Sequence, residues 1–242
     1  MLSVSAMMEQ HRVSAEMATG SRNLPKCYGI AKNFFTKAKA ADPSTATPPY
    51  PLIFGKSLSC IKPHGKPFPI PWHAADDAVC HEVELGVIMN SKKATEVSHW
   101  TDRVAGWVLL IDYTDKVQLG KAVKGKTPFF LSKCQDNFLS LSDLIPKEAI
   151  VDPYAVELTL KINGEVRHRD LTANMNFKIE DQIAHIENEG NSQLGEGDLL
   201  MTGTPEGISP VMPGDLLEAT LMYEGKVLAT ITEKVVKEVK PF

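Results

Sequence analysis

The sequence lacks an apolar run long enough to span a membrane. Its longest such run, near residues 104–111, falls well short of the roughly 20 residues that a spanning helix needs. It also lacks an excess of positive charge, because 26 lysines and arginines stand against 30 aspartates and glutamates. Nucleic-acid binding depends mainly on neutralising phosphates. Neither a membrane nor a nucleic acid is therefore expected as a partner.

Cysteine is scarce and widely spaced. The four cysteines form no C-x-x-C pair, which argues against a zinc knot and against a small disulfide framework. Reduced thiols in an intracellular compartment are the simpler interpretation for Cys27, Cys60, Cys80 and Cys134. We expect a cytoplasmic protein, with the mitochondrion as the alternative location.

The first 25 residues have the composition of a tail rather than of a packed domain. They are rich in serine and methionine and contain Arg12 and Arg22, which faintly resembles an organellar presequence. Glu9 and Glu16 argue against a presequence, because such peptides are poor in acidic residues. We interpret residues 1–25 as a flexible tail and residues 26–242 as one domain.

Short apolar segments bounded by turn residues follow a proline-rich connector at residues 43–51. Segments of this kind are typical of strands. They predict strands at residues 51–56, 66–72, 79–89 and 104–113.

Two hairpins and one helix complete the prediction of secondary structure. Alternating residues on both sides of Asn163-Gly164 predict a two-residue turn, and a second hairpin turns at Glu224-Gly225. Residues 178–189 have helical spacing, with three isoleucines on one stripe. The fold class is therefore α+β, strand-rich, with a few helices.

Two carboxylates share one face of the predicted strand at residues 79–89. Side chains alternate along a strand, so Glu82 and Glu84 project together, about 7 Å apart, while Val83, Leu85 and Val87 face the core. One interpretation is a half-exposed strand whose polar face meets water. The other is a site in which a cation offsets the repulsion between two buried like charges.

A third carboxylate, Asp112, ends the apolar segment WVLLIDYTD. An aspartate at such a position is commonly a turn or capping residue. If it met the two glutamates, the three side chains would offer Mg²⁺ or Mn²⁺ three oxygen ligands and leave other positions open. The order of the segments alone does not show that they converge.

Four motifs together resemble the fumarylacetoacetate hydrolase family, particularly its acylpyruvase and oxaloacetate decarboxylase branch. They are HEVELGVIM (81–89), LLIDYTD (109–115), LSKCQDNF (131–138) and GDLLMTGTPEGISPVMPGD (197–215). The resemblance runs from about residue 27 to 221. It implies a mixed β-sandwich roll, a small 2-oxo acid as substrate, and assembly as a homodimer.

The resemblance also implies roles for individual residues. It assigns Mg²⁺ (or Mn²⁺) to Glu82, Glu84 and Asp112, and catalytic contacts to Lys133 and Thr204. It assigns substrate binding to Lys56, Gln118, Thr202, Gly203 and Pro205. Without the resemblance, Lys133 reads as a solvated lysine and TGTPEG as a tight turn.

The sequence departs from the family in the segment that resembles its lid, residues 26–50. Hydrolytic members carry a His and a Glu there, but Lys37 stands where the His is expected and Ala40 where the Glu is. Water attack on a ketone needs a base within reach, and a lysine is normally protonated at neutral pH.

The expected function is a divalent-metal-dependent hydrolase that cleaves C–C bonds in acylpyruvate-type acids. One alternative is an oxaloacetate decarboxylase or keto–enol isomerase that uses the same site without the lid pair. Another is a member that binds metal and ligand without chemistry. Turnover of acetylpyruvate and oxaloacetate separates these possibilities.

Overall fold

The computed structural model describes residues 24–35 and 47–240, so the expected tail is outside this range up to residue 23. The first sheet has seven strands. Their order is β2 (Leu52–Lys56), β1 (Cys27–Ala31), β10 (Leu199–Met201), β4 (Val79–Met89), β5 (Val104–Asp115) and β6 (Leu139–Leu141), and β7 (Ile145–Pro146) also pairs with β5. β1 runs parallel to β10, whereas β4 and β5 form a long antiparallel pair.

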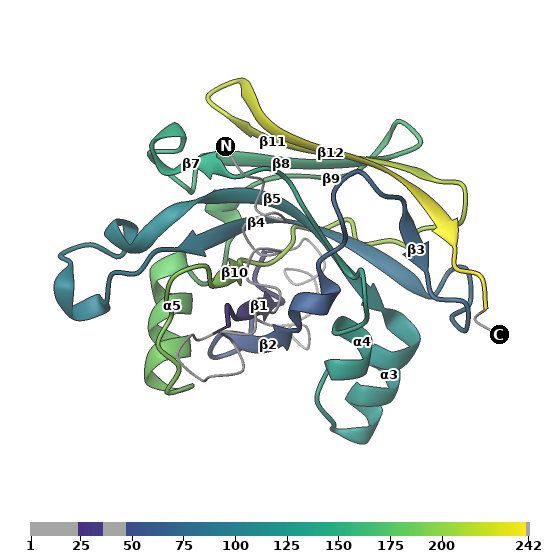
Figure 1. Ribbon diagram of the computed structural model, residues 1–242, viewed down its shortest axis with the longest axis horizontal. Coiled ribbons are helices and arrows are strands. Elements are labelled where there is room, and N and C mark those ends of the chain that lie inside the picture. The colour runs from purple at the N-terminus through teal and green to yellow at the C-terminus, as the bar shows by residue number, and fades with distance from the viewer. Residues whose placement is uncertain (1–23, 36–46, 241–242) are drawn as a thin grey trace, which may run out of the picture.

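The second sheet has five strands. Their order is β3 (Phe68–Ile70), β12 (Lys226–Lys237), β11 (Leu216–Tyr223), β8 (Val156–Ile162) and β9 (Glu165–Leu171). Figure 1 shows this sheet packed over β4 and β5. The helices α3 (Lys116–Gly125), α4 (Phe130–Lys133) and α5 (Ile179–Asn188) lie on the other side of the first sheet. The predicted strand-rich α+β class is confirmed.

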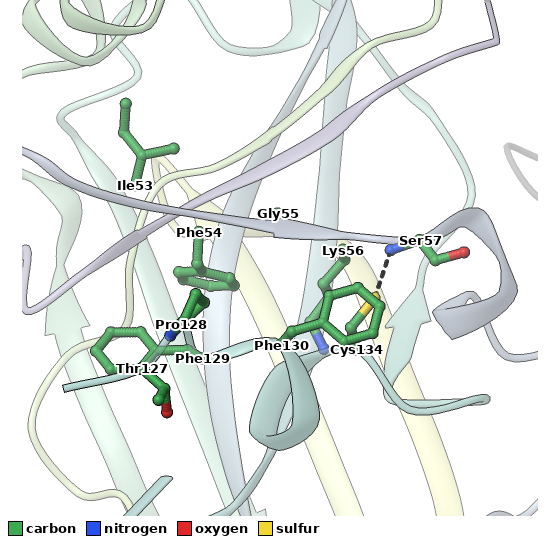
Figure 2. Close-up of a pocket in the computed structure, with 10 residues that line it drawn as sticks. All are labelled: Ile53, Phe54, Gly55, Lys56, Ser57, Thr127, Pro128, Phe129, Phe130 and Cys134. Carbon is green, nitrogen blue, oxygen red and sulfur yellow. Dashed lines mark hydrogen bonds between the residues drawn. The ribbon is translucent and has the colours of Figure 1, made fainter. Parts of the chain in front are cut away.

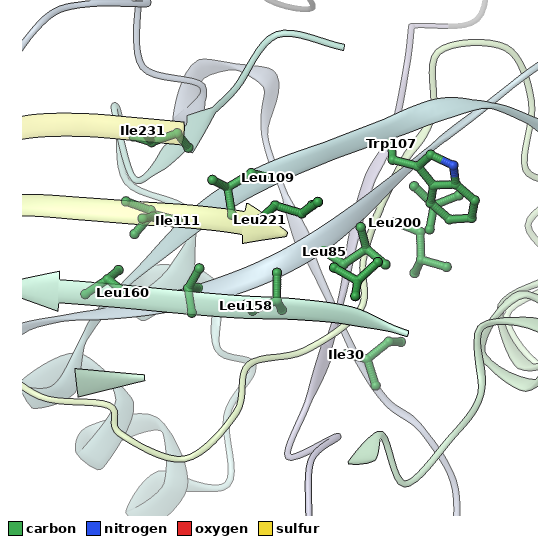
Figure 3. Packing of buried hydrophobic residues seen from close by; sticks show 14 of the residues in the cluster. Ile30, Leu85, Trp107, Leu109, Ile111, Leu158, Leu160, Leu200, Leu221 and Ile231 are labelled. Carbon is green, nitrogen blue, oxygen red and sulfur yellow. The ribbon is translucent and has the colours of Figure 1, made fainter. Parts of the chain in front are cut away.

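The main core fills the space between the two sheets. Leucines and isoleucines of β4 and β5 meet those of β8, β11 and β12, as Figure 3 shows for Leu85, Leu109, Leu158, Leu160 and Leu221. Full burial of each such side chain contributes roughly 1.5–3 kcal/mol. The core therefore fixes which face of β4 and β5 is left for other contacts.

A second, smaller core covers the opposite face of the seven-stranded sheet. It contains Val108 and Leu110 of β5, Leu199 of β10 and Phe54 of β2. Along β4, Val83, Leu85 and Val87 belong to the main core, so the predicted division of the strand into two faces is confirmed. Because both faces are covered, all eleven residues of β4 are buried.

The locally encoded elements match the sequence predictions. Asn163 and Gly164, with φ of 52° and 83°, connect β8 to β9, and Glu224 and Gly225 connect β11 to β12 with φ of 49° and 74°. Two successive positive φ angles are what a type I′ hairpin turn requires. The helix predicted at residues 178–189 is α5, whose isoleucines are buried.

The expected strands are also present, at slightly different bounds. The segment 66–72 contains only the short β3, and the strand expected at 104–113 extends to Asp115. Cys27–Ala31, within the segment expected to resemble a lid, forms a strand inside the sheet. None of the helices in the described residues is both long enough and apolar enough to cross a bilayer.

Candidate metal and substrate site

Three buried carboxylates converge on the outer face of the seven-stranded sheet. Glu82 and Asp112 face each other directly across the antiparallel pair of β4 and β5, and Glu84 follows two residues along β4. One carboxylate oxygen of each lies within 4.8 Å of the others. The exposed fraction is 8% for Glu82, 1% for Glu84 and 0% for Asp112. The interpretation of Glu82 and Glu84 as a water-facing polar stripe is therefore wrong.

Three lysines surround this acidic cluster (Glu82, Glu84 and Asp112). Lys133 Nζ lies 2.7 Å from Glu82 Oε2 and 2.5 Å from Asp112 Oδ2. Lys56 Nζ lies 2.7 Å from Asp112 Oδ1, and the partly exposed Lys116 reaches Glu82 Oε1 at 3.5 Å. Lys133 is thus not a solvated lysine but the counter-charge at the centre of the cluster.

The surroundings shift the pKa values of Glu82 and Glu84 in opposite directions. Burial opposes ionisation of Glu82, but the Lys133 and Lys116 ammonium groups outweigh it and lower the pKa of Glu82 to about 2. For Glu84, burial and then the neighbouring Asp112 and Glu82 charges raise the pKa well above its ordinary value. Burial also opposes the charge on Lys133, yet Asp112 and Glu82 raise its pKa. In the absence of a cation, neighbouring charges therefore favour the ionised form of Glu82, the neutral form of Glu84 and the protonated form of Lys133.

The Thr-Gly-Thr-Pro turn after β10 closes one side of the cluster. The Gly203 N–H donates to Glu84 Oε2 at 2.7 Å, and the Thr202 hydroxyl donates to the Leu85 carbonyl at 2.8 Å. Thr204 Oγ1 is buried and has no hydrogen-bond partner in the described part of the chain. A buried hydroxyl without a partner is costly, which makes Thr204 Oγ1 a candidate ligand contact of the kind that the resemblance implies.

Asn33 holds the same turn from behind, a contact that the sequence predictions did not include. Its side-chain amide donates to the Thr202 carbonyl at 2.7 Å and to the Phe177 carbonyl at 3.1 Å. Gly203 has a φ of +102°, and a Cβ there would lie 2.7 Å from Asn33 Cβ. The turn fits only because residue 203 is a glycine. The signal available in the sequence was the Lys32-Asn33 pair at the start of the lid-like motif.

Two residues expected to bind substrate have different surroundings. Lys56 is fully buried at its side chain, and besides Asp112 its ammonium donates to the carbonyls of Phe138, at 2.8 Å, and Lys133. Gln118 lies in the first turn of α3, where its backbone N–H is capped by Asp115 at 2.9 Å. Its side chain makes no hydrogen bond with a described residue.

A cavity of about 590 Å³ lies between β2 and the segment 127–134. Figure 2 shows Phe54 and Lys56 projecting from β2 toward Phe129 and Phe130, which form the opposite wall. Lys133 Nζ stands 4.6 Å from the centre of the Phe54 ring. The walls of this cavity therefore share Lys56 and Phe54 with the surroundings of the acidic cluster.

Comparison with protein-family models tests the resemblance to the fumarylacetoacetate hydrolase family that the four motifs suggest. Residues 26–236 match the family model of the fumarylacetoacetate (FAA) hydrolase C-terminal domain. The chain belongs to the fumarylacetoacetate hydrolase family. The resemblance predicted from HEVELGVIM and TGTPEGIS is thereby confirmed, and with it membership in a family of enzymes.

Several curated relatives in this family carry one name. A rice protein named oxaloacetate tautomerase FAHD1, mitochondrial, is 34% identical over 203 residues, covering 80% of this chain and 84% of its own length. The human protein of the same name is 34% identical over 170 residues, covering 70% and 75%. These names match the expected alternative, an isomerase or decarboxylase of oxaloacetate, better than the acylpyruvate hydrolase.

Solved structures show the family fold. 2-Hydroxyhepta-2,4-diene-1,7-dioate isomerase from Mycobacterium marinum is 25% identical, with a TM-score of 0.69 over 89% of this chain and 75% of its own. Fumarylpyruvate hydrolase from Pseudomonas aeruginosa, solved with Mn²⁺ and pyruvate, has a TM-score of 0.76 and covers 90% of this chain and 94% of its own. At 21% identity, the second comparison supports the fold alone.

The donor set of this family member fits a hard divalent cation. Three convergent carboxylates are the ligands that Mg²⁺ and Mn²⁺ prefer, and like charges this close need a counter-charge. Lys133 supplies that counter-charge to Glu82 and Asp112 but makes no ion pair with Glu84. Lys37 and Ala40, the positions that replace the expected His and Glu of the lid, lie outside the described residues.

Proposed function

We propose that this chain is a divalent-metal-dependent oxaloacetate tautomerase, which interconverts the keto and enol forms of the acid. The observation that carries the proposal is a buried acidic cluster centred on Lys133, in a chain 34% identical over four-fifths of its length to proteins named oxaloacetate tautomerase. Mg²⁺ or Mn²⁺ is the proposed cofactor, held by Glu82, Glu84 and Asp112.

Tautomerisation suits this site because it needs no attacking water. A base, here proposed to be solvent water, takes the C3 proton of oxaloacetate, and the C2 oxygen receives a proton in exchange, while every C–C bond stays intact. The His and Glu that hydrolytic members use to activate water are therefore not required, and their replacement by Lys37 and Ala40 is consistent with the proposal. Hydrolysis of acylpyruvates, the main expectation from the sequence, is the less supported reaction.

Each group of the site has a proposed role. When bound, the cation supplies Lewis acidity toward the keto and carboxylate oxygens of the substrate. Lys133, whose pKa is raised by Asp112 and Glu82 against the opposing effect of burial, remains protonated and donates a hydrogen bond to the developing enolate oxygen. Thr204 Oγ1, which has no partner among the described residues, donates to the substrate carboxylate.

The remaining proposed contacts belong to the rim and to the turn. Lys116, with about a third of its side chain exposed, is placed to attract a dianionic acid toward Glu82 and its neighbours. Gly203 keeps Glu84 in position through its N–H, and Thr202 and Pro205 shape the turn that presents Thr204. Lys56 sets the orientation of Asp112 rather than binding substrate directly.

The names of the relatives also bear on location. They are called mitochondrial, which favours the alternative location over the cytoplasm. We therefore extend the proposal to a mitochondrial protein, testable by imaging the full chain with a C-terminal fluorescent tag. Assembly as a homodimer stays a prediction, to be checked by the molar mass in solution.

One assay set tests the reaction. Purified protein, first stripped with a chelator and then loaded with Mn²⁺, is mixed with freshly dissolved enol-oxaloacetate, and the decay of the enol ultraviolet absorbance is followed beside pyruvate release. We expect metal-dependent loss of the enol signal faster than pyruvate appears. Pyruvate release at the same rate as enol loss would make the protein a decarboxylase instead. Cleavage of acetylpyruvate would restore the hydrolase, and tight oxalate binding without any turnover would indicate a binding protein.

A further inference from the structure

Two buried histidines on different sheets join the loop that follows Thr204 to the strand that carries Glu82. His168 of β9 has Nδ1 3.1 Å from the Pro205 carbonyl oxygen and 3.0 Å from the Glu206 carbonyl oxygen. Its Nε2 lies 3.0 Å from His81 Nδ1, and His81 Nε2 lies 2.9 Å from Ser209 Oγ. Both rings are 0% exposed and meet edge to face.

The partners fix the direction of every hydrogen bond in this chain. Carbonyl oxygens only accept, so His168 Nδ1 carries a hydrogen and donates to both of them. A neutral His168 then accepts at Nε2, which requires His81 to donate from Nδ1. His81 therefore accepts at Nε2, and the Ser209 hydroxyl is the donor. Both histidines carry their hydrogen on Nδ1.

The hydrogen-bond chain through His168 and His81 holds both ends of the loop formed by residues 205–209. Pro205 and Glu206 are held by His168, and Ser209 is held by His81 through its hydroxyl and by a backbone hydrogen bond from His81 N–H to its carbonyl at 3.3 Å. Between these points Gly207 presses against β9, where a Cβ would lie 1.9 Å from the Arg167 carbonyl oxygen. The loop thus has little freedom to slide along β9.

The same loop begins at the site. Thr204 precedes Pro205, and the Gly203 N–H is bound to Glu84. At the other end of the hydrogen-bond chain, His81 directly precedes Glu82 on β4. We propose that His81 and His168 are positioning residues, which hold residues 205–209 so that Thr204 Oγ1 and Gly203 N–H point at the acidic cluster and its ligand. The proposed effect on ligand binding rests on the function proposed above.

A role limited to packing makes a different prediction from a positioning role. If the rings only filled space, an apolar side chain of similar size would leave ligand affinity unchanged in the folded protein. If they position the loop, the donor at the Nδ1 position of residue 168 matters most. Asparagine places an amide nitrogen near that position and can still donate to the Pro205 carbonyl, whereas leucine cannot.

The first test reads the hydrogen positions directly. Long-range ¹H–¹⁵N correlation spectra of histidine-labelled protein at neutral pH distinguish the two neutral tautomers. We expect two histidines in the Nδ1–H form, both assigned by their loss in His81→Asn and His168→Asn. Finding either ring in the Nε2–H form or doubly protonated would overturn the hydrogen-bond chain. This measurement needs neither substrate nor turnover.

The second test measures ligand binding at saturating Mn²⁺, with oxalate as the probe, by calorimetry. We expect His168→Leu to weaken oxalate binding by about tenfold, the effect of roughly one lost buried hydrogen bond. His168→Asn should stay within about threefold of the wild type, because the donor to the loop is retained. Mn²⁺ affinity without oxalate should be unchanged in both variants, and exposed His73→Leu serves as the control.

The outcomes separate the two proposals. Equal oxalate affinity in folded His168→Leu and wild type overturns the positioning role, as does an equal loss in His168→Leu and His168→Asn. Failure of the wild type to tautomerise oxaloacetate overturns the proposed reaction only, because the tautomer spectrum and oxalate titration remain readable. If His168→Leu does not fold, the comparison of His168→Asn with His81→Leu still decides, since the latter removes the donor to His168 Nε2.

Discussion

Lys133 forms ion pairs with Glu82 and Asp112, which are two of the three carboxylates that would hold the proposed cation. Replacing it by methionine leaves buried negative charges without their central counter-charge, which costs about 3–5 kcal/mol when a buried pair is broken. We expect metal-free Lys133→Met to lose unfolding free energy by this amount in urea denaturation. Because a competing cation has gone, it should also bind Mn²⁺ more tightly and regain more stability from Mn²⁺ than the wild type does.

Catalytic activity should fall in Lys133→Met, although Mn²⁺ binding becomes tighter. Removal of one donor to a developing oxyanion costs about 100-fold or more in kcat, so Mn²⁺-loaded Lys133→Met should be nearly inactive despite its tight metal. Lys116→Met is the matched control, because Lys116 is partly exposed and 3.5 Å from Glu82. Equal stability loss in the two variants would contradict the central place given to Lys133.

Replacing Thr204 or Thr202 by valine removes one hydroxyl group in each case, so the two variants can be compared directly. Thr204→Val removes a hydroxyl with no partner among the described residues, so its stability should stay within about 0.5 kcal/mol of the wild type while oxalate binding weakens about tenfold. Thr202→Val loses the hydrogen bond to Leu85 and should cost about 1 kcal/mol. Calorimetry and thermal unfolding of both variants check this. A stability loss confined to Thr204→Val would reverse the assignment.

At the residue scale, the sequence predicted chemistry where the signal is local. Alternation along a strand placed Glu82 and Glu84 on one face, and the motif drew attention to Asp112 and Lys133. Full burial of the carboxylates could not be predicted, because it depends on the packing of β10 and β2 around them. Nor could His168, whose partner His81 lies 87 residues away.

At the scale of elements, the site depends on the register between β4 and β5. Gly86 allows the close approach: a Cβ there would lie 2.5 Å from Val108 Cγ2 and 2.8 Å from Leu110 Cδ2. We expect Gly86→Ala to cost about 1–3 kcal/mol through overpacking, and to lower Mn²⁺ affinity because Glu84 and Asp112 shift relative to each other. Chemical denaturation and a metal titration measure the two effects.

A second glycine provides the control for this experiment. Gly120 lies in the middle of α3, with open space where a Cβ would be. Gly120→Ala should raise the unfolding free energy by about 0.5–1 kcal/mol through helix propensity and leave Mn²⁺ affinity unchanged. A stable Gly86→Ala with normal metal binding would show that the strand pair tolerates a shift.

The elements that the sequence predicted well are those whose causes are local. The Asn163-Gly164 and Glu224-Gly225 turns and the isoleucine stripe of α5 each arise within a few residues. The parallel pairing of β1 with β10 joins Cys27 to Leu199, and no local pattern specifies such a partner. The helix α3 has no comparable local cause, because its first turn depends on Asp115, which ends β5 and caps the helix.

At the scale of the whole molecule, buried polar groups connect the site to both sheets. Tyr113, next to Asp112, donates to Glu233 of β12, which also accepts from Ser140 and pairs with Lys62 at 2.9 Å. The His81–His168 chain is the second such connection, between β4 and β9. Because these groups hold their native charge states only in the folded protein, global stability should depend on pH.

The histidine pair dominates that dependence in weakly acidic solution. Burial, and then the neighbouring His168, lower the pKa of His81 from an ordinary 6.5 to about 3, and burial lowers the pKa of His168 as well. Below pH 6.5, His81 and His168 therefore bind protons more readily in the unfolded chain than in the folded protein. The contribution of His81 to stability is fully present above pH 6.5 and falls as the pH decreases, by about 1.4 kcal/mol per pH unit between the two pKa values. His168 contributes in the same direction.

Glu84 acts in the opposite sense, because its raised pKa keeps a proton in the folded protein that the unfolded chain releases as pH rises above 4.5. Comparing His81→Asn with the wild type cancels this contribution. We expect urea unfolding of the variant between pH 6.5 and 5 to show a slope smaller by about 1.4 kcal/mol per pH unit. Exposed His73→Asn should keep the wild-type slope. An unchanged slope in His81→Asn would mean that His81 takes up its proton in the folded protein.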